Sequence, residues 1–374
     1  MFNAAGSTAR ARCICGAFVT TVCIWVCLSP SGTAAQPRAG RVPLVYCTDL
    51  FHPPDDPDDW FDLATVFSIE EFDIRGIVLD QGEKQMKRTG RIPVEQMMVI
   101  TGKKKVVSVY GLPRKLKSPE DKGLDQPQEL QVGVELILNV LRRSDKKVTT
   151  IAVGSLRDVC AAFNREPGLL REKVGRLYVV AGHSDGGKEY NVQLDPHAYV
   201  GVMRSGLPVC WLPCFGREPY VSRWQFRQGE VLDKCSLQVQ NYFAYGLTKA
   251  DPAKVDAILA LYKPIPTEEK AKVWAMNRAM WSTAAFVDAA GRTMVMKGGQ
   301  WRAVPREGGK ARNPVFGFVP AKVTVSDKGI SRFADIEINS TEANMRIFRF
   351  EGTFGDYNKA MEQAFEGLLK RLGR

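Results

Sequence analysis

Short, continuously apolar runs alternate with segments whose apolar residues recur every three or four positions. The continuous runs predict buried strands, and they cover residues 43–47, 74–79, 106–110, 148–153, 177–181 and 207–212. The periodic segments predict amphipathic helices, and they cover residues 60–69, 129–142, 156–164 and 196–204. Strands that alternate with helices are typical of parallel βαβ units. We therefore expect an α/β fold with a Rossmann-like, mostly parallel central sheet flanked by helices.

The last third of the chain has a different pattern. Residues 240–290 look helical, residues 315–319, 322–325 and 345–350 predict strands, and residues 357–372 predict a closing amphipathic helix. We expect this C-terminal, β-containing extension to belong to the same domain. Since ligands of open parallel sheets bind beyond the carboxyl ends of the strands, functional residues should follow the predicted strands directly.

The first 35 residues have the features of a secretory signal. Arg10 and Arg12 precede an apolar run at 13–28, and the small residues 33–35 form an acceptable cleavage site. A membrane anchor is the alternative, but the run falls just short of a comfortable span of about 20 residues. We expect a signal peptide at 1–35, a domain at 36–374, a secreted or periplasmic location, and no stable membrane span after processing.

Composition narrows the class of protein. Apolar residues at 45% and charged residues at 25% are ordinary globular values. The formal net charge of +11 is scattered, without a recognition helix or an aromatic-basic array, so we expect no nucleic-acid partner. Five cysteines lie beyond residue 35. Cys210 and Cys214 bracket an apolar segment that holds them too far apart for a disulfide if it is extended, and we expect packed thiols.

The densest chemical signal directly follows the first predicted strand. Residues 48–59 contain Asp49, His52, Asp55, Asp56, Asp58 and Asp59. Clustered carboxylates of this kind bind hard cations such as Ca²⁺. They also suit a solvated acidic turn in which Asp58 or Asp59 caps the next helix. Spacing alone does not decide between these interpretations.

The arrangement resembles the aspartate motif of the inosine-uridine-preferring nucleoside hydrolases. In that family an aspartate ends the first strand and an Asp-Asp pair opens the first helix. Asp49 matches the first position and Asp58-Asp59 matches the pair, with Asp55-Asp56 as a competing assignment. The connecting turn is longer here and lacks the family's glycine. Three later segments match in the same order, at 150–158, 189–196 and 205–208, so the resemblance runs from about residue 43 to 290.

The resemblance implies a fold of the nucleoside hydrolase type and calcium-dependent hydrolysis of the N-glycosidic bond of ribonucleosides or a related N-glycoside. By this match Asp49, Asp59 and the Val153 carbonyl hold Ca²⁺, with a weak or water-mediated contact from Ser282. Asp58 is then the general base that activates water. Glu189 and Asn191 hydrogen-bond the ribose. The implied partner is a small-molecule nucleoside or glycoside, and the oligomeric state stays open, a homo-oligomer included.

This chain differs most from the family at the family's last motif. Where the family has a His-Asp pair, this chain has Trp281-Ser282. Tryptophan has no suitable pKa to protonate a leaving base, but it can stack on an aromatic ring. Two alternatives follow: a non-catalytic ribose- or sugar-binding protein on the same fold, or a hydrolase of another glycoside.

The chain has three histidines. His183 follows the fifth strand at the ligand-binding edge, which makes it a candidate for substrate contact. His52 is expected to pair with aspartates, with a role as substitute acid as the alternative. His197 opens a helix and is expected to be structural.

Overall fold

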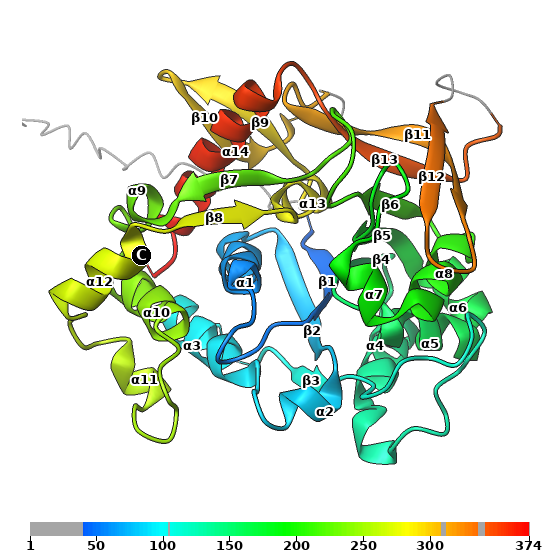
Figure 1. Ribbon diagram of the computed structural model, residues 1–374, viewed down its shortest axis with the longest axis horizontal. Coiled ribbons are helices and arrows are strands. Elements are labelled where there is room, and N and C mark those ends of the chain that lie inside the picture. The colour runs from blue at the N-terminus through cyan, green and yellow to red at the C-terminus, as the bar shows by residue number, and fades with distance from the viewer. Residues whose placement is uncertain (1–39, 104, 308–311, 336–340, 374) are drawn as a thin grey trace, which may run out of the picture. The chain divides into compact units, whose positions relative to one another are not determined.

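The predicted strands meet in a nine-stranded sheet with the order β12-β11-β13-β6-β5-β4-β1-β2-β3 (Figure 1). Seven strands run parallel: β1 (Val42–Thr48), β2 (Phe72–Leu79), β3 (Ser108–Tyr110), β4 (Val148–Val153), β5 (Val174–Val180), β6 (Val209–Leu212) and β13 (Met345–Phe350). β11 (Phe316–Val325) pairs antiparallel with β13 and with β12 (Ser331–Asp335). The expected fold class, including the C-terminal strands, is confirmed.

This computed structural model describes residues 40–103, 105–307, 312–335 and 341–373. The predicted signal peptide lies outside these ranges. Residues 40–374 cluster as one unit, and the C-terminal strands extend its main sheet. Among the described residues, no helix has the length and apolar character needed to cross a membrane.

The strand order has a switch point between β1 and β4. From β1 the chain first adds β2 and β3 on one side and later adds β4, β5 and β6 on the other. At such a point the connections leave in opposite directions, and a crevice opens beyond the carboxyl ends of the two strands. Thr48 and Val153 are paired neighbours at these two ends, so the residues that follow them face a shared space.

Side chains of the central strands alternate between two hydrophobic cores. Leu44 and Tyr46 of β1 join one core, and Val45 and Cys47 join the other, because successive strand residues point to opposite faces. The first core contains α1 (Asp58–Ser68), α3 (Arg91–Thr101), α10 (Leu237–Leu247), α13 (Thr283–Ala289) and α14 (Phe354–Leu369). The second contains α4 (Val132–Arg143), α5 (Arg157–Arg165) and α8 (Pro196–Arg204). Burial on both faces explains why the strands read as continuous apolar runs.

The remaining elements are short. They are α2 (Gly82–Gln85), the 3₁₀ helix η1 (Gln128–Leu130), α6 (Pro167–Lys173), α7 (Tyr190–Leu194), α9 (Gln228–Leu232), α11 (Ala257–Ala260), α12 (Thr267–Trp274), β7 (Trp224–Arg227), β8 (Asn277–Met280), β9 (Arg292–Lys297) and β10 (Gln300–Pro305). The expectation of a wholly helical 240–290 segment is wrong at β8, which pairs with β7. The two strands expected at 315–325 are one strand, since Pro320 lies in register opposite Arg346.

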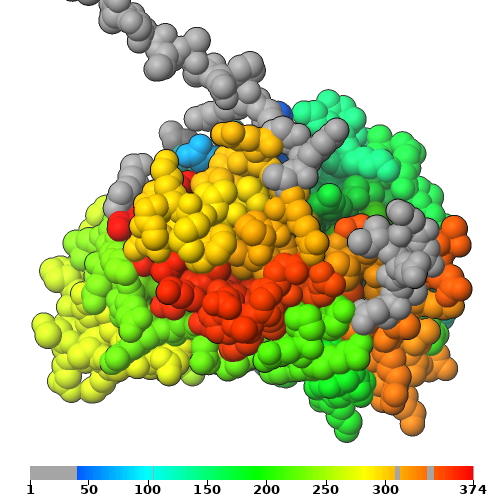
Figure 2. Space-filling view, turned by 90° about the horizontal axis from the view of Figure 1, so that it is seen from above, coloured from blue at the N-terminus to red at the C-terminus, as the bar shows by residue number. Residues whose placement is uncertain are grey.

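The C-terminal helix ties the later elements together. Figure 2 shows α14 (red) lying between the β9–β10 segment (gold) and the segment around β7 (green), and α14 contacts both β10 and β7. The Thr353 hydroxyl accepts a hydrogen bond from the Asp356 N–H and caps its first turn. The five cysteines beyond residue 35 are buried and free of disulfides, as expected for Cys210 and Cys214.

Candidate active site

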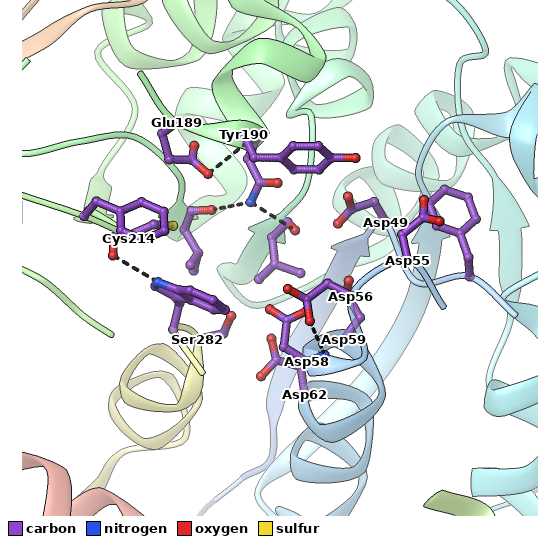
Figure 3. Close-up of a pocket in the computed structure, with 16 residues that line it drawn as sticks. Asp49, Asp55, Asp56, Asp58, Asp59, Asp62, Glu189, Tyr190, Cys214 and Ser282 are labelled. Carbon is purple, nitrogen blue, oxygen red and sulfur yellow. Dashed lines mark hydrogen bonds between the residues drawn. The ribbon is translucent and has the colours of Figure 1, made fainter. Parts of the chain in front are cut away.

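A cavity of about 330 Å³ lies beyond the carboxyl ends of the central strands, at the switch point. Residues from β4, β5, α1, α7 and the segments after β1 and β6 line it, together with two residues before α13 (Figure 3): Asp49, Phe51, Asp55, Asp56, Asp58, Asp59, Asp62, Val153, Val180, Glu189, Tyr190, Asn191, Cys214, Phe215, Trp281 and Ser282. Eight of the nine residues assigned to the site from the sequence are in this set; His183 is not.

Three carboxylates of the cavity come from α1. Asp58 and Asp59 occupy its first turn, and Asp62 lies one turn later on the same face. Asp49 follows β1 directly. The Thr48 hydroxyl donates to Asp59 Oδ1 at 2.7 Å, which fixes the start of α1 against the end of β1. The main chain therefore brings four aspartates to one side of the cavity.

Within the described part of the chain, these carboxylates form no ion pair, and the cavity lining includes no lysine or arginine. Arg278 and Lys84 lower the pKa of Asp58 and of Asp49, but these effects are smaller than that of burial. Burial raises the pKa of Asp58 and of Asp59 well above their usual range, and neighbouring aspartates raise each pKa further. Burial also raises the pKa of Asp49, with an added contribution from Asp80. Because a buried carboxylate is costly to ionise without compensation, these groups need protons or a cation.

The other two aspartates of the same segment are compensated. Asp55 pairs with Lys84 and Arg88, each at 2.5 Å, and Asp56 pairs with Arg278 at 2.9 Å. Both are exposed. Asp59 is buried and Asp58 is half-buried, and neither forms an ion pair with another described residue. This difference favours Asp58-Asp59 over Asp55-Asp56 as the counterpart of the family's Asp-Asp motif.

The wall opposite α1 is formed by the ends of β4 and β5 and by α7. Asn191 Nδ2 donates to the Val180 carbonyl at 3.1 Å and, at 3.5 Å, to the Val153 carbonyl. Glu189 caps α7: its carboxylate accepts from the N–H groups of Gly182, Asn191 and Val192 at 2.8–3.1 Å. Because Asn191 Nδ2 is engaged with these carbonyls, Asn191 Oδ1 is the atom that can accept a hydrogen bond from a ligand. Glu189 stabilises the first turn of α7, which contains Asn191.

Aromatic side chains form the remaining wall. Trp281 and Phe215 meet edge to face at 5.9 Å, and Tyr190 is 56% exposed beside the cavity. Trp281 Nε1 donates to the Cys214 carbonyl at 3.0 Å, so the indole N–H is committed and its ring is held in place. Ser282 directly precedes α13, and its hydroxyl lowers the pKa of Asp62 through a hydrogen bond, although burial raises this pKa to about 7 overall.

None of the three histidines lines the cavity. His183 pairs with Asp185 and lies near Phe215, with ring centroids 6.4 Å apart. His52 is buried against Tyr245 and bonds the Ala250 carbonyl at 2.7 Å. The expected pairing of His52 with aspartates is therefore wrong, because its ring turns into the core. His197 lies in the first turn of α8.

Sequence reasoning missed several residues of the site. Asp62 carried a usable signal, since it follows Asp58 by four residues on one helix face. Asp80 did too, because it ends β2 as Asp49 ends β1; it accepts from the Ser155 N–H and hydroxyl, both at 2.7 Å, beside the cavity. Tyr190 opens the five-residue helix α7 and Phe215 follows β6, and no local pattern predicts the direction of their side chains.

The oxygen atoms of the cavity suit a hard cation. Asp49, Asp59 and the Val153 carbonyl supply the oxygen donors that Ca²⁺ prefers. Asp62 Oδ1 is buried and lacks a hydrogen-bond partner within the described chain, as expected beside a positive ion. In those same residues, no three histidine, cysteine, aspartate or glutamate side chains form a ready-made metal site. The predicted ligand set contains only two such side chains, so it is compatible with this finding.

Comparisons with known proteins agree with this geometry. Residues 54–311 match the family described as "Inosine-uridine preferring nucleoside hydrolase". A pyrimidine-specific ribonucleoside hydrolase of Citrobacter koseri is 26% identical over 189 residues, 45% of this chain and 58% of the relative. One from an Enterobacter species is 38% identical over 82 residues, 21% of this chain and 26% of the relative. This chain thus spans less than two thirds of the length of these relatives.

Solved structures share the fold. A purine-preferring ribonucleoside hydrolase from Gardnerella vaginalis superposes with a TM-score of 0.56 at 15% identity, covering 88% of this chain and 99% of the other. A plant nucleoside hydrolase gives a TM-score of 0.54 at 13% identity, covering 88% and 99%. Fold, acidic cavity and family match converge: the chain belongs to the inosine-uridine preferring nucleoside hydrolase family.

Proposed function

We propose that this protein hydrolyses the N-glycosidic bond of ribonucleosides, or of a related N-glycoside, with Ca²⁺ as its cofactor. The observation that carries the proposal is one cavity in which two of the walls differ in chemistry. Aspartates without an ion pair among the described residues form one of them, and aromatic rings form another. A sugar diol needs the first kind of wall, and a planar base needs the second.

Asp49, Asp59 and the Val153 carbonyl would hold the calcium ion, with Ser282 as a weaker oxygen donor. Bound calcium supplies a fixed positive charge that lets the clustered carboxylates ionise together and polarises the oxygens of water and sugar. The Thr48 hydroxyl, bonded to Asp59 Oδ1 at 2.7 Å, keeps the second carboxylate in its orientation. Family resemblance and the donor set support this assignment.

Asp58 is the proposed general base. It precedes Asp59 in the first turn of α1 and faces the same cavity. In the proposed step Asp58 takes a proton from water, the water oxygen bonds to the anomeric carbon, and the glycosidic electron pair leaves with the base nitrogen. Asn191 Oδ1 contacts the sugar. Glu189, whose carboxylate accepts three backbone N–H groups, keeps Asn191 in place and adds negative charge near the developing cationic sugar.

The leaving base receives little help from acid catalysis. No histidine lines the cavity, and the Trp281 N–H is bonded to the Cys214 carbonyl. We therefore propose that Trp281, Phe215 and Tyr190 bind the base by ring contacts, and that substrates with good leaving groups react fastest. The matched relatives are named for pyrimidine and for purine substrates. Of these two classes, purine nucleosides should lose the smaller part of their hydrolysis rate through the missing general acid.

Substrate hydrolysis tests this function directly. Purified protein is incubated with single nucleosides and with p-nitrophenyl riboside, in calcium and in EDTA, and released base or reducing sugar is measured. We expect calcium-dependent release, faster from the activated riboside than from inosine or uridine. Asp58→Asn is the matched control for contaminating hydrolases. Release that is equal in calcium, in EDTA and in the Asp58→Asn protein would contradict the proposal.

A sugar-binding protein without catalysis is the second candidate. The specific observation behind it is the pair Trp281-Ser282 at the position of the family's His-Asp pair. Calcium-dependent binding of adenosine or ribose, with no hydrolysis of any substrate including the activated riboside, would establish the binder.

The location of the protein follows from residues 1–35, which we propose are removed as a secretory signal. Expression with its native N-terminus, followed by N-terminal sequencing of the exported protein, tests this. A mature chain that starts near residue 36 is expected. A chain that keeps residues 1–35 in the membrane fraction would favour the anchor.

A further inference from the structure

A second, larger cavity of about 770 Å³ lies over one face of the sheet and shares no lining residue with the catalytic cavity. Pro320 of β11, Arg346 of β13, Cys210 of β6 and Tyr178 of β5 are paired in register across four adjacent strands, so they share one face. Three of them line the cavity, and the fourth, Tyr178, bonds a lining residue.

The charge of this cavity is opposite to that of the catalytic one. Five arginines line it, at positions 176, 306, 312, 346 and 349, with Asp288 as the one acidic lining residue. Asp288 binds Arg176 and Arg306 at 2.9 and 3.1 Å. Glu351 binds Arg312 and Arg349. Among the described residues, these two carboxylates thus pair with four of the five guanidinium groups, and the five arginines exceed the two carboxylates by three positive charges.

Two buried donors in the cavity also lack acceptors. Asn313 is 4% exposed; its Oδ1 accepts the Val315 N–H at 3.0 Å, but its Nδ2 has no partner within the described ranges. The buried Nε of Arg306 is in the same state. A buried donor without an acceptor destabilises the folded protein, and both donors belong to residues that line the same cavity. The unpaired donors and the excess positive charge both favour a ligand with anionic acceptor oxygens.

We propose that this cavity binds a phosphate-bearing small molecule. Guanidinium groups match phosphate oxygens in charge and in planar hydrogen-bond geometry. Phe316, Phe318 and Pro320 give the cavity an apolar wall beside the arginines, so a phosphate that carries a ring, as in a nucleotide, fits as well as an inorganic one. The two sources share one recognition chemistry, and this inference does not depend on the proposed hydrolase activity.

Calorimetry of the full chain in EDTA, with sodium pyrophosphate and with ADP, tests the site. Adenosine is the uncharged control, because its proposed binding in the catalytic cavity requires calcium. We expect saturable pyrophosphate binding that Arg346→Gln weakens by at least about tenfold, since one charge-assisted contact is lost. Arg302→Gln is the matched control: it removes the same charge from β10, outside this cavity, and should leave affinity unchanged within about twofold.

A second variant tests whether the unused donor of Asn313 faces the ligand. Asn313→Asp keeps the Oδ1 acceptor for Val315 and replaces the unused donor by a negative oxygen. We expect it to fold with an unchanged or raised Tm, because it gains arginine neighbours, and to lose pyrophosphate binding. Tighter binding of ADP than of pyrophosphate would identify a nucleotide as the source, and equal binding would identify the phosphate group alone. The proposal would be overturned if neither probe bound saturably up to about 10 mM. It would also be overturned if Arg346→Gln and Arg302→Gln bound pyrophosphate with equal affinity.

Discussion

Two pairs of aspartates lie three positions apart in one segment, yet their surroundings differ completely. Asp55 and Asp56 have side chains 48% and 59% exposed and pair with Lys84, Arg88 and Arg278. Asp58 and Asp59 open α1, face a cavity without a cationic side chain, and have raised pKa values. The difference teaches that neither charge nor spacing marks the functional pair. The functional pair is recognised by its burial without a counter-charge, because only such a pair needs a bound cation.

The largest expected difference between the pairs is in catalysis. Asp58→Asn keeps the shape of the side chain but removes the proposed base, so kcat should fall by about 10²–10⁴-fold. Asp56→Asn should change kcat by less than about threefold, since an exposed ion pair contributes about 0–1 kcal/mol. Initial rates with the activated riboside measure both. Equal losses in the two variants would remove the distinction between the pairs.

The stability of the calcium-free protein should depend on pH through the buried carboxylates. Burial raises the pKa of Asp62 from 3.8 to about 7, and the pKa values of Asp58 and Asp59 shift in the same direction. The folded state therefore keeps protons that the unfolded chain releases. The contribution of Asp62 to stability is fully present below about pH 4 and is lost as the pH rises towards 7, by about 1.4 kcal/mol per pH unit. The shifts of Asp58 and Asp59 act in the same direction.

Thermal unfolding in EDTA and in calcium, between pH 5 and 8, measures this effect (about three pH units of the titration window). Calcium should restore much of the lost stability at the upper end, because it replaces the protons as the counter-charge. The exposed pair provides the control: Asp55→Asn should leave the slope of stability against pH unchanged. A Tm in EDTA that stays constant or rises across this range would contradict the raised pKa values.

A smaller effect should follow from the contact between β1 and α1. Thr48→Val keeps the shape of the side chain and removes the hydroxyl that bonds Asp59 Oδ1 at 2.7 Å. Loss of a hydrogen bond to a charged group costs about 1.5–3 kcal/mol at most, so calcium affinity should fall several-fold and the Tm should drop. Thr65→Val on the same helix removes a hydroxyl that bonds only the Phe61 carbonyl. Equal calcium affinity of Thr48→Val and Thr65→Val would contradict a role of the Thr48 hydroxyl in calcium binding.

The smallest predicted effect concerns the aromatic wall. Trp281→Ala should raise KM for purine nucleosides by about 2–10-fold, since ring contacts contribute about 0.5–1.5 kcal/mol. Trp281→Phe keeps a ring but loses the hydrogen bond to the Cys214 carbonyl, so its KM should lie between those of the wild type and Trp281→Ala. KM and kcat are measured separately, because a stacking residue acts mainly on KM. An unchanged KM in Trp281→Ala would exclude the ring from substrate binding.

The sequence predicted the central sheet better than it predicted the site. Six parallel strands could be placed because burial on both faces makes each a continuous apolar run. The strand-end rule then pointed to Asp49, whereas Val153 was assigned through the family resemblance. The pairing of β7 with β8 depends on long-range contacts, which no local period encodes. The β9–β10 hairpin is local and turns at Gly298-Gly299, a hairpin signal that the sequence does contain. The same applies to His52, whose ring stacks on Tyr245, nearly two hundred positions later in the sequence.

The expected ribose contacts of Glu189 and Asn191 stay predictions, and the structure adds contacts that the sequence did not predict. Three backbone N–H groups bond the Glu189 carboxylate. Asn191 Nδ2 bonds the ends of β4 and β5, which leaves Oδ1 for a ligand. Such contacts depend on hydrogen-bond geometry at a short helix, which the sequence does not specify.

Calorimetric titration of calcium into the wild type, Asp59→Asn and Asp55→Asn proteins tests the central claim most directly. Both variants remove one negative charge from the same segment, so only the location of the charge differs. The account predicts binding of one calcium ion by the wild type, at least about tenfold weaker binding by Asp59→Asn, and nearly unchanged binding by Asp55→Asn. Undiminished calcium affinity in Asp59→Asn would contradict it.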